Sequence, residues 1–297
     1  MSTIEELKHQ INTAQDLQSV VKTMKALAAV SIHQYEKAVR SLSEYNRTLE
    51  MGWQILLNKH PEMLSKKTSN PTQRLGLVVF GSDWGMCGQF NERIADYTQT
   101  YVDSLSIAES DRFILTVGAK ISDRLKTLGQ NCETGFNLPS SVGGITPIIQ
   151  EIVLALETWR QQQRVDRIMV IYNQITSGAV YHPTRLQIFP LNLEWWQQLK
   201  QQKWISRSIP TFTMDKDKLA AALFSQYFFV SLYRACAESL KSENTSRLAA
   251  MQMAEKNIAE RFSELTQEFN HQRQTTITEE LLDIVSGFEA LTKGVGN

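Results

Sequence analysis

The feature that most constrains this chain is a seven-residue hydrophobic repeat that runs through its N-terminal segment. With Ile4 as position a, the a and d positions through Leu56 are apolar or aromatic except at Gln18, Lys25 and Asn46. A heptad pattern sustained over this span predicts a long coiled-coil helix, roughly 85 Å in length at about 1.5 Å per residue. The polar exceptions are candidates for residues that set the register of the coil.

The C-terminal segment carries the features of a second long helix. From Lys216 to about Ser286 it contains no proline, and its apolar residues recur at helical spacing. Gly287 stands where a helix C-cap is expected. Because neither helix can bury its apolar stripe alone, the sequence predicts an antiparallel coiled coil of an N-terminal helix (1–60) and a C-terminal helix (216–297).

The middle of the chain has a different period. Short runs rich in β-branched residues alternate with helical stretches, which is the pattern of a parallel α/β domain. The expected strands are 74–80, 112–118, 167–174 and 179–191, the last with Pro183 and Pro190 at an edge or at its ends, and the expected helices are 91–105, 119–128 and 146–163. The predicted fold class is therefore α/β with long helices, and the α/β domain spans 61–215.

Composition and charge argue against several classes of protein. The chain has 31 Lys and Arg against 31 Asp and Glu, so it lacks the net positive charge typical of nucleic-acid binding. No apolar run approaches the roughly 20 residues that span a bilayer, and the charged start MSTIEELKHQ is unlike a signal peptide. Cys87, Cys132 and Cys236 lie far apart, which favours free and mostly buried thiols in a reducing compartment.

The glycine-rich stretch FGSDWGMCGQFN (80–91) follows an apolar run, as many phosphate-binding turns do. The Walker form requires a lysine and a hydroxyl after its last glycine, and no lysine occurs in this stretch. The dinucleotide form requires G-x-G-x-x-G. Gly85 and Gly88 keep its last interval, but the first is broken by Asp83, whose carboxylate would repel a pyrophosphate. A tight strand-to-helix turn with a structural role is therefore favoured over a nucleotide site.

The sequence contains no recognisable motif for metal binding or for a catalytic nucleophile. The histidines are scattered and form no HExxH pair, and neither Ser82 nor Ser177 lies in a G-x-S-x-G turn. The sequence therefore predicts no catalytic residue, no metal site and no cofactor-binding site.

Four blocks of sequence, in order along nearly the whole chain, resemble the gamma subunits of F-type rotary ATP synthases. VVKTMKALAAV (20–30) resembles the family's I-T-K-A-M-x-M-V-A-A, and SDWGMCGQFN (82–91) resembles S-D-R-G-L-C-G-x-x-N. SENTSRLAAMQMAEKN (242–257) resembles S-E-x-A-A-R-M-x-A-M-x-x-A-x-x-N. NHQRQTTITEELLDIVSGFEAL (270–291) resembles N-x-x-R-Q-x-x-I-T-x-E-L-x-E-I-V-x-G-A-x-A-L.

The resemblance implies a fold and a role. The family's fold is an antiparallel coiled coil of the terminal helices beside a Rossmann-like foot domain. Its role is a central shaft that couples ion flow through the membrane sector to ATP synthesis or hydrolysis in a ring of alpha and beta subunits, without being catalytic itself. Its foot meets the epsilon subunit and the membrane rotor ring, on the cytoplasmic face of a bacterial-type energy-coupling membrane.

The resemblance also implies contact residues. Those expected to meet the alpha/beta ring are Met24, Lys25, Arg247, Gln274, Thr278 and Glu280, and the residues that match the family loop are Ser82, Asp83, Gly85, Cys87, Gly88 and Asn91. Without the resemblance, Met24 reads as a core methionine and Arg247 as a solvated side chain that snorkels from the seam.

Some positions depart from the family pattern. Trp84 stands for the usual loop arginine, Gln89 for the second loop glycine and Phe288 for an alanine after the terminal glycine. The basic collar is diluted to VSIHQYEKAV (30–39), and the Gln- and Trp-rich stretch 192–204 is interpreted as a surface connection. These departures indicate a divergent branch.

Two functions of other classes compete with the shaft. An α/β nucleotide-binding enzyme with helical arms would use the glycine loop and would bind nucleotide as an isolated protein. A coiled-coil scaffold unrelated to rotation would form stable homodimers through its exposed seam.

Overall fold

The computed structural model describes residues 3–61, 74–105, 107–177, 180–191, 199, 204, 208 and 210–294. The chain forms two compact units, Met1–Leu27 with Ala250–Asn297 and Ala28–Ala249. Its elements are α1 (Ile4–Lys59), β1 (Leu75–Phe80), α2 (Phe90–Asp103), η2 (Glu109–Asp111), β2 (Arg112–Val117), α3 (Ala119–Thr127), β3 (Cys132–Phe136), η3 (Val142–Gly144), α4 (Ile145–Gln162), β4 (Arg167–Ser177), β5 (Val180–Phe189) and α6 (Lys216–Gly294). The domain boundaries at 60 and 215 stay a prediction.

Helix α1 confirms the long N-terminal helix expected from the heptads. It begins with a capping box, in which the Glu6 N–H donates to Thr3 Oγ1 and the Thr3 N–H donates to Glu6 Oε2. The d positions from Leu7 to Leu56 are buried except Leu42, whereas most a positions are only half-buried. The d side of the heptad therefore forms the main seam.

Helix α6 begins at Lys216, as expected, and ends later than expected. Asp215 Oδ1 accepts the N–H groups of Asp217 (3.0 Å) and Lys218 (3.2 Å), which satisfies donors that the first turn leaves free. The expected C-cap at Gly287 is wrong, because the helix continues to Gly294. A single glycine costs a helix only about 1 kcal/mol, and helix-forming Ala and Leu residues follow it.

The long helices run antiparallel where they pair. In the larger unit, the Lys241 ammonium lies 3.1 Å from Glu36 Oε1, and Tyr45 donates to Gln226 at 2.8 Å. Residues later in α1 therefore contact residues earlier in α6, which is the pattern of antiparallel helices. In the smaller unit, Lys25 forms an ion pair with Glu255.

The larger unit contains a five-stranded sheet of order β3-β2-β1-β4-β5. β1 pairs in parallel with β2 and β4, β2 in parallel with β3, and β4 antiparallel with β5. The strands expected from β-branched runs are confirmed, with the last as an antiparallel edge. β3 was not expected, since its sequence CETGF has neither an apolar run nor clear alternation.

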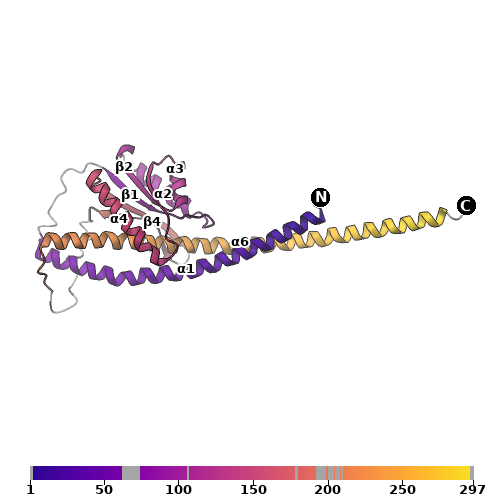
Figure 1. Ribbon diagram of the computed structural model, residues 1–297, viewed down its shortest axis with the longest axis horizontal. Helices are drawn as coiled ribbons and strands as arrows, with labels where there is room; N and C mark the ends of the chain where they lie inside the picture. Colours follow the sequence, from indigo (N-terminus) through magenta and orange to yellow (C-terminus); the bar gives the residue numbers. More distant parts are fainter. Residues whose placement is uncertain are drawn as a thin grey trace. The chain divides into compact units, whose positions relative to one another are not determined.

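One face of the sheet is covered by α2 and α3 (Figure 1). Leu75, Leu77 and Val79 of β1 point to this face and pack with Ile94 of α2 and Ile121 of α3. The alternation along the strand is the period of two that buries successive side chains on opposite faces.

The other face is covered by α4 and the long helices. Val78 and Phe80 of β1 pack in one cluster with Ile149 of α4, Tyr35 of α1 and Leu232 of α6. Because α6 lies between α1 and the sheet, its middle is buried on nearly every side; buried residues here include Leu232, Ala235, Cys236, Ala237, Glu238, Ser239, Leu240, Ser242, Glu243 and Ser246. Small side chains permit this close approach, and the polar ones among them form the site described below.

Candidate functional site

Glycines shape the loop between β1 and α2. A Cβ on Gly81 would lie 2.2 Å from the Cβ of Ile121, and the Gly81 N–H donates to the Val117 carbonyl at 2.8 Å. Gly88 has a φ of +59°, in the left-handed region that glycine adopts without strain. Gly85 differs, since nothing lies within 4 Å of the Cβ that a larger residue would carry there.

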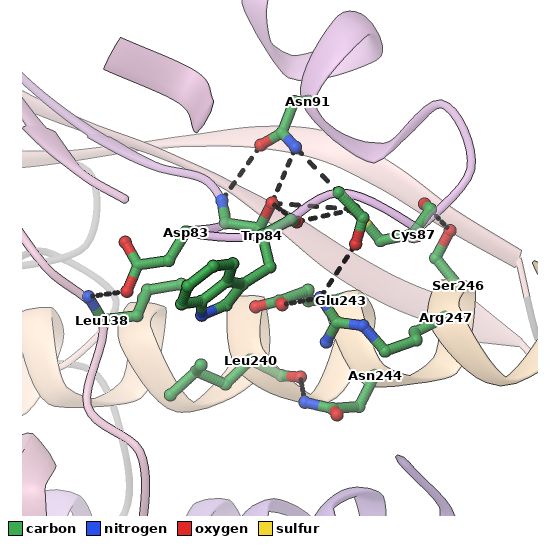
Figure 2. A network of polar contacts seen from close by, with 12 residues as sticks. Asp83, Trp84, Cys87, Asn91, Leu138, Leu240, Glu243, Asn244, Ser246 and Arg247 are labelled. Atoms are coloured by element: carbon green, nitrogen blue, oxygen red, sulfur yellow. Dashed lines mark hydrogen bonds and ion pairs between the residues drawn. The ribbon is translucent and has the colours of Figure 1, made fainter. Parts of the chain in front are cut away.

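A buried network joins the two ends of this loop (Figure 2). Asn91 Oδ1 accepts the Ser82 N–H at 3.0 Å, and Asn91 Nδ2 donates to Ser82 Oγ at 2.7 Å. Ser82 Oγ in turn donates to the Trp84 carbonyl at 2.8 Å and lies 3.6 Å from Cys87 Sγ. Burial raises the pKa of the Cys87 thiol, so it stays neutral and is a poor nucleophile.

Asp83 caps two neighbouring segments. Its Oδ1 accepts the N–H of Ala119, the first residue of α3, at 2.9 Å, and its Oδ2 accepts the Leu138 N–H at 2.8 Å. The Ser82 carbonyl accepts the next N–H of α3, from Lys120, at 2.9 Å. A helix N-terminus is where a phosphate would bind, and here the Asp83 carboxylate and the Ser82 carbonyl occupy its first two N–H donors.

Helix α6 holds the loop and strand β4 from the other side. Ser246 Oγ donates to the Cys87 carbonyl at 2.5 Å, and Ser242 Oγ donates to the Asn173 carbonyl at 2.9 Å. Loop and strand meet at the carboxyl ends of the neighbouring strands β1 and β4. In open α/β sheets, ligands bind in the crevice where the strand order reverses, at the carboxyl ends of the strands. Here Ser242 and Ser246 of α6 bond the strand and the loop at that place.

Glu243 and Arg247 form an ion pair at the same place (Figure 2). Glu243 Oε1 lies 2.7 Å from Arg247 Nη2, and only 5% and 12% of these side chains are exposed. The same guanidinium donates to the Gly85 carbonyl at 3.4 Å. Burial raises the pKa of the Glu243 carboxyl to about 7; Arg247 lowers this pKa, and the Asp83 charge raises it. The sequence interpretation of Arg247 as a snorkelling, solvated side chain is therefore wrong.

The other residues expected to meet the alpha/beta ring belong to the smaller unit. Met24 and Lys25 are half-buried, and Lys25 pairs with Glu255. Three side chains near the C-terminus of α6 are exposed, namely Gln274, Thr278 and Glu280. Arg247 is thus the member of this set that the structure brings to the family loop.

Sequence reasoning missed most of the α6 side of the site. Ser242, Glu243 and Ser246 lie in a block that carried the resemblance, but only Arg247 was singled out within it. What could have identified these three residues in the sequence is that they are polar residues at helical spacing in a segment that is otherwise apolar. Among the departures, Trp84 is 77% exposed at the loop tip, and the side chain of Phe288 lies outside the described residues.

The structure also bears on ligands and membranes. Cys87 and Cys236 are free and buried and Cys132 is free and half-buried, as expected. Within the described ranges, no three His, Cys, Asp or Glu side chains gather in a way that could hold a metal ion. The helices in that part of the chain include none long and apolar enough to cross a membrane.

Comparison with known proteins places the chain in a family. Residues 3–291 match the family described as ATP synthase. The ATP synthase gamma chain of Bacteroides fragilis is 27% identical over 298 residues, covering 97% of this chain and 99% of the relative. That of Azobacteroides pseudotrichonymphae is 28% identical, covering 98% and 100%. The solved rotor of the Euglena gracilis mitochondrial ATP synthase shares the fold, with a TM-score of 0.65 at 15% identity over 92% of this chain and 98% of the other. The family match spans almost the whole length, and the chain therefore belongs to the ATP synthase family as a gamma-type subunit.

Proposed function

We propose that this chain is the central rotor shaft of an F-type ATP synthase and has no catalytic site of its own. In this role it transmits rotation between an ion-driven membrane sector and an alpha/beta ring in which ATP is made or hydrolysed. The family match over residues 3–291 carries the proposal. Two long helices that pair antiparallel support it, because they supply stiffness without a globular core.

The proposal includes specific partners and a location. The shaft is enclosed by alpha and beta subunits, and its α/β unit meets the epsilon subunit and the membrane rotor ring. The complex holds it at the cytoplasmic face of a bacterial-type energy-coupling membrane. Similarity to bacterial gamma chains supports this location. Co-purification of the tagged chain with alpha and beta subunits tests the assembly, and a chain that forms only homodimers would favour the scaffold alternative.

The proposed absence of catalysis rests on the loop. Asp83 and the Ser82 carbonyl already occupy the first two N–H donors of α3, and the glycine-rich stretch 80–91 contains no lysine of the kind that meets a phosphate in a Walker loop. We expect titration of the isolated chain with Mg-ATP to give no saturable heat in the micromolar range. Saturable binding that Gly85→Trp abolishes would instead support the enzyme alternative.

The exposed end of α6 supplies the proposed contacts with the ring. Gln274, Thr278 and Glu280 are exposed, and the Thr278 hydroxyl donates within the helix to the Gln274 carbonyl at 2.8 Å. Met24 and Lys25 add partly exposed surface on α1. Contacts that break and re-form on each turn affect coupling more than folding, because they exist only in the assembled complex.

Alanine substitutions in the reconstituted complex test this assignment. We expect Gln274→Ala, Thr278→Ala and Glu280→Ala to lower the ratio of ions pumped to ATP hydrolysed, while the melting temperature of the isolated chain stays within about 1–2 °C of wild type. Glu268→Ala, at another exposed carboxylate of the same helix, is the matched control and should leave coupling unchanged. Normal coupling in all three variants would contradict the assignment.

A further inference from the structure

Glu243 is a carboxylate sealed between helix α6 and the glycine loop. One oxygen, Oε1, pairs with Arg247. The other, Oε2, is buried and has no hydrogen-bond partner among the described residues. A buried carboxylate in this state is costly when charged, because only half of its acceptor capacity is satisfied.

The titratable groups that interact electrostatically with Glu243 come from three elements. Arg247 and the Cys236 thiol lie on α6, Asp83 and the Cys87 thiol lie in the loop, and the Tyr35 phenol lies on α1. Burial raises the pKa of the two thiols and of the phenol, so these three groups are neutral near pH 7. Among the described residues, Arg247 lowers the pKa of Glu243 and Asp83 raises it.

The balance among these groups places the titration of Glu243 near neutrality. Desolvation raises the pKa of its carboxyl from 4.5 to about 7, against the opposing effect of Arg247. The geometry agrees with this direction, since one oxygen of the carboxylate is buried without a hydrogen-bond partner among the described residues. A small change of pH around 7 thus changes the charge of a buried group.

The same guanidinium links Glu243 to the loop. Arg247 Nη2 lies 2.7 Å from the carboxylate and 3.4 Å from the Gly85 carbonyl, so the two acceptors share one donor group. The next residues of the loop, Met86 and Cys87, connect this contact to the Ser246 hydroxyl. When Glu243 is neutral, it no longer competes as an anion for the guanidinium.

We propose that Glu243 and Arg247 form a proton-controlled clamp on the loop 82–88. With Glu243 protonated, Arg247 donates its hydrogen bond to the Gly85 carbonyl, and this contact holds the loop closed against α6. With Glu243 ionised, the carboxylate draws Arg247 away and attracts water to its unpartnered oxygen, and the loop loosens. The exposed side chains of Trp84 and Met86 at the loop tip are then less firmly positioned.

The direction follows from proton linkage. In the open loop Glu243 is solvated and has its ordinary pKa, whereas in the closed loop this pKa is raised, so the closed form binds the proton more tightly. The closed clamp is therefore fully favoured below about pH 4.5 and loses stability as the pH rises through about 7. Loosening levels off above that value.

The Cys87 thiol reports the opening. It belongs to the loop and is buried in this structure, and a pyridyl disulfide reagent that reacts at acidic pH can label it in the isolated full chain, with peptide mass spectrometry to separate the three cysteines. Rates are divided by those of the unfolded chain at the same pH, which removes the intrinsic pH dependence of the thiol. We expect Cys87 labelling to rise by about tenfold or more between pH 5.5 and 7.5 and then level off, while Cys236 in the core stays protected.

Two variants separate the clamp from general loosening. Glu243→Gln, a neutral isostere, should keep Cys87 slowly labelled at every pH and abolish the rise. Glu238→Gln is the matched control, because Glu238 is also buried on α6, pairs with Arg234 at 2.8 Å and has one oxygen without a partner among the described residues, yet its partner Arg234 is not the residue that bonds the loop. It should retain the wild-type profile.

A third variant removes the cation of the clamp. Arg247→Met lacks the donor that bonds the Gly85 carbonyl, so Cys87 should be labelled fast at every pH and the rise with pH should be lost. A flat wild-type profile overturns the proposal, as does a rise that persists in Glu243→Gln. If the glutamine variant fails to fold, slow labelling of Cys87 in Arg247→Met, or a wild-type rise with pH in that variant, overturns it instead. All tests use the free chain, so they are independent of the rotor role.

Discussion

At the scale of single residues, the site depends on positions where only one kind of side chain fits. Gly81 lies so close to α3 that an added Cβ would stand 2.2 Å from Ile121 and 2.9 Å from Asn91 Oδ1. Asn91 uses both ends of its carboxamide on Ser82, so it cannot move aside without breaking buried hydrogen bonds. The glycine is therefore required by packing and the amide by hydrogen bonding.

This packing gives a residue-scale prediction. Gly81→Ala should lower the free energy of unfolding by more than about 3 kcal/mol, because the nearest atoms belong to a packed helix and a bonded amide that cannot yield. Gly85→Ala, four residues away in the same loop, has open space around its Cβ and should change it by less than about 0.5 kcal/mol. Urea denaturation of both variants measures the difference, and equal effects would show that the loop adapts.

At the scale of elements, the two long helices bury apolar side chains in both units, and the larger unit has the larger cluster. Near its C-terminus α1 contributes Leu49, Trp53, Leu56 and Leu57 to a hydrophobic cluster with the first turns of α6. Trp53 is fully buried there, with its ring 4.8 Å from that of Phe224 in an edge-to-face contact. In the smaller unit the buried d positions of α1 are Leu7, Ala14 and Val21.

The cluster leads to a prediction for the helix pair. Trp53→Ala should lower the free energy of unfolding by about 3–5 kcal/mol, since it leaves a large cavity between α1 and α6. Val30→Ala is a suitable control, because Val30 lies on the same helix and is exposed. Guanidinium denaturation followed by circular dichroism measures both, and a loss below about 1 kcal/mol for the tryptophan variant would contradict the packing described here.

At the scale of the whole molecule, buried groups set the response to alkaline pH. Burial raises the pKa values of the Cys87 and Cys236 thiols and of the Tyr172 and Tyr227 phenols, and it raises that of Tyr35 from 10.0 to about 12. Each of these groups is neutral when buried and ionises more easily when the chain unfolds. Their contribution to stability is fully present below the unfolded pKa and is lost as the pH rises toward the folded one.

The chain should therefore lose thermal stability steeply above about pH 10. For Tyr35 alone the loss is about 1.4 kcal/mol per pH unit between pH 10 and 12. Tyr35→Phe removes this group and should make the fall in melting temperature shallower, whereas Tyr45→Phe, at an exposed tyrosine of the same helix, should not. Melting curves from pH 8 to 11 provide the comparison, and identical slopes would contradict the prediction.

The elements that sequence reasoning found are those whose signal is local. The heptads of α1 and the β-branched runs of β1, β2 and β4 are hydrophobic patterns visible within each segment. Their burial could therefore be inferred without knowing which other segment packs against them. β3 has no such pattern. It forms a strand because it pairs in parallel with the edge of β2. The same holds for the site: Asp83 and Asn91 were recognised in the loop, but the role of Glu243 depends on a contact with a loop far away in the chain.

That separation has a consequence for synthesis. The serine that donates to the Cys87 carbonyl lies 159 residues later in the sequence, and the stretch of α6 that contacts the loop and β4 is synthesised after the strands β1 to β5. Until then the strands can form, yet their crevice and the apolar face reserved for α6 are uncovered. The α/β unit thus reaches its finished state only after α6 has been made, and nascent chains must be kept from associating through that face until then.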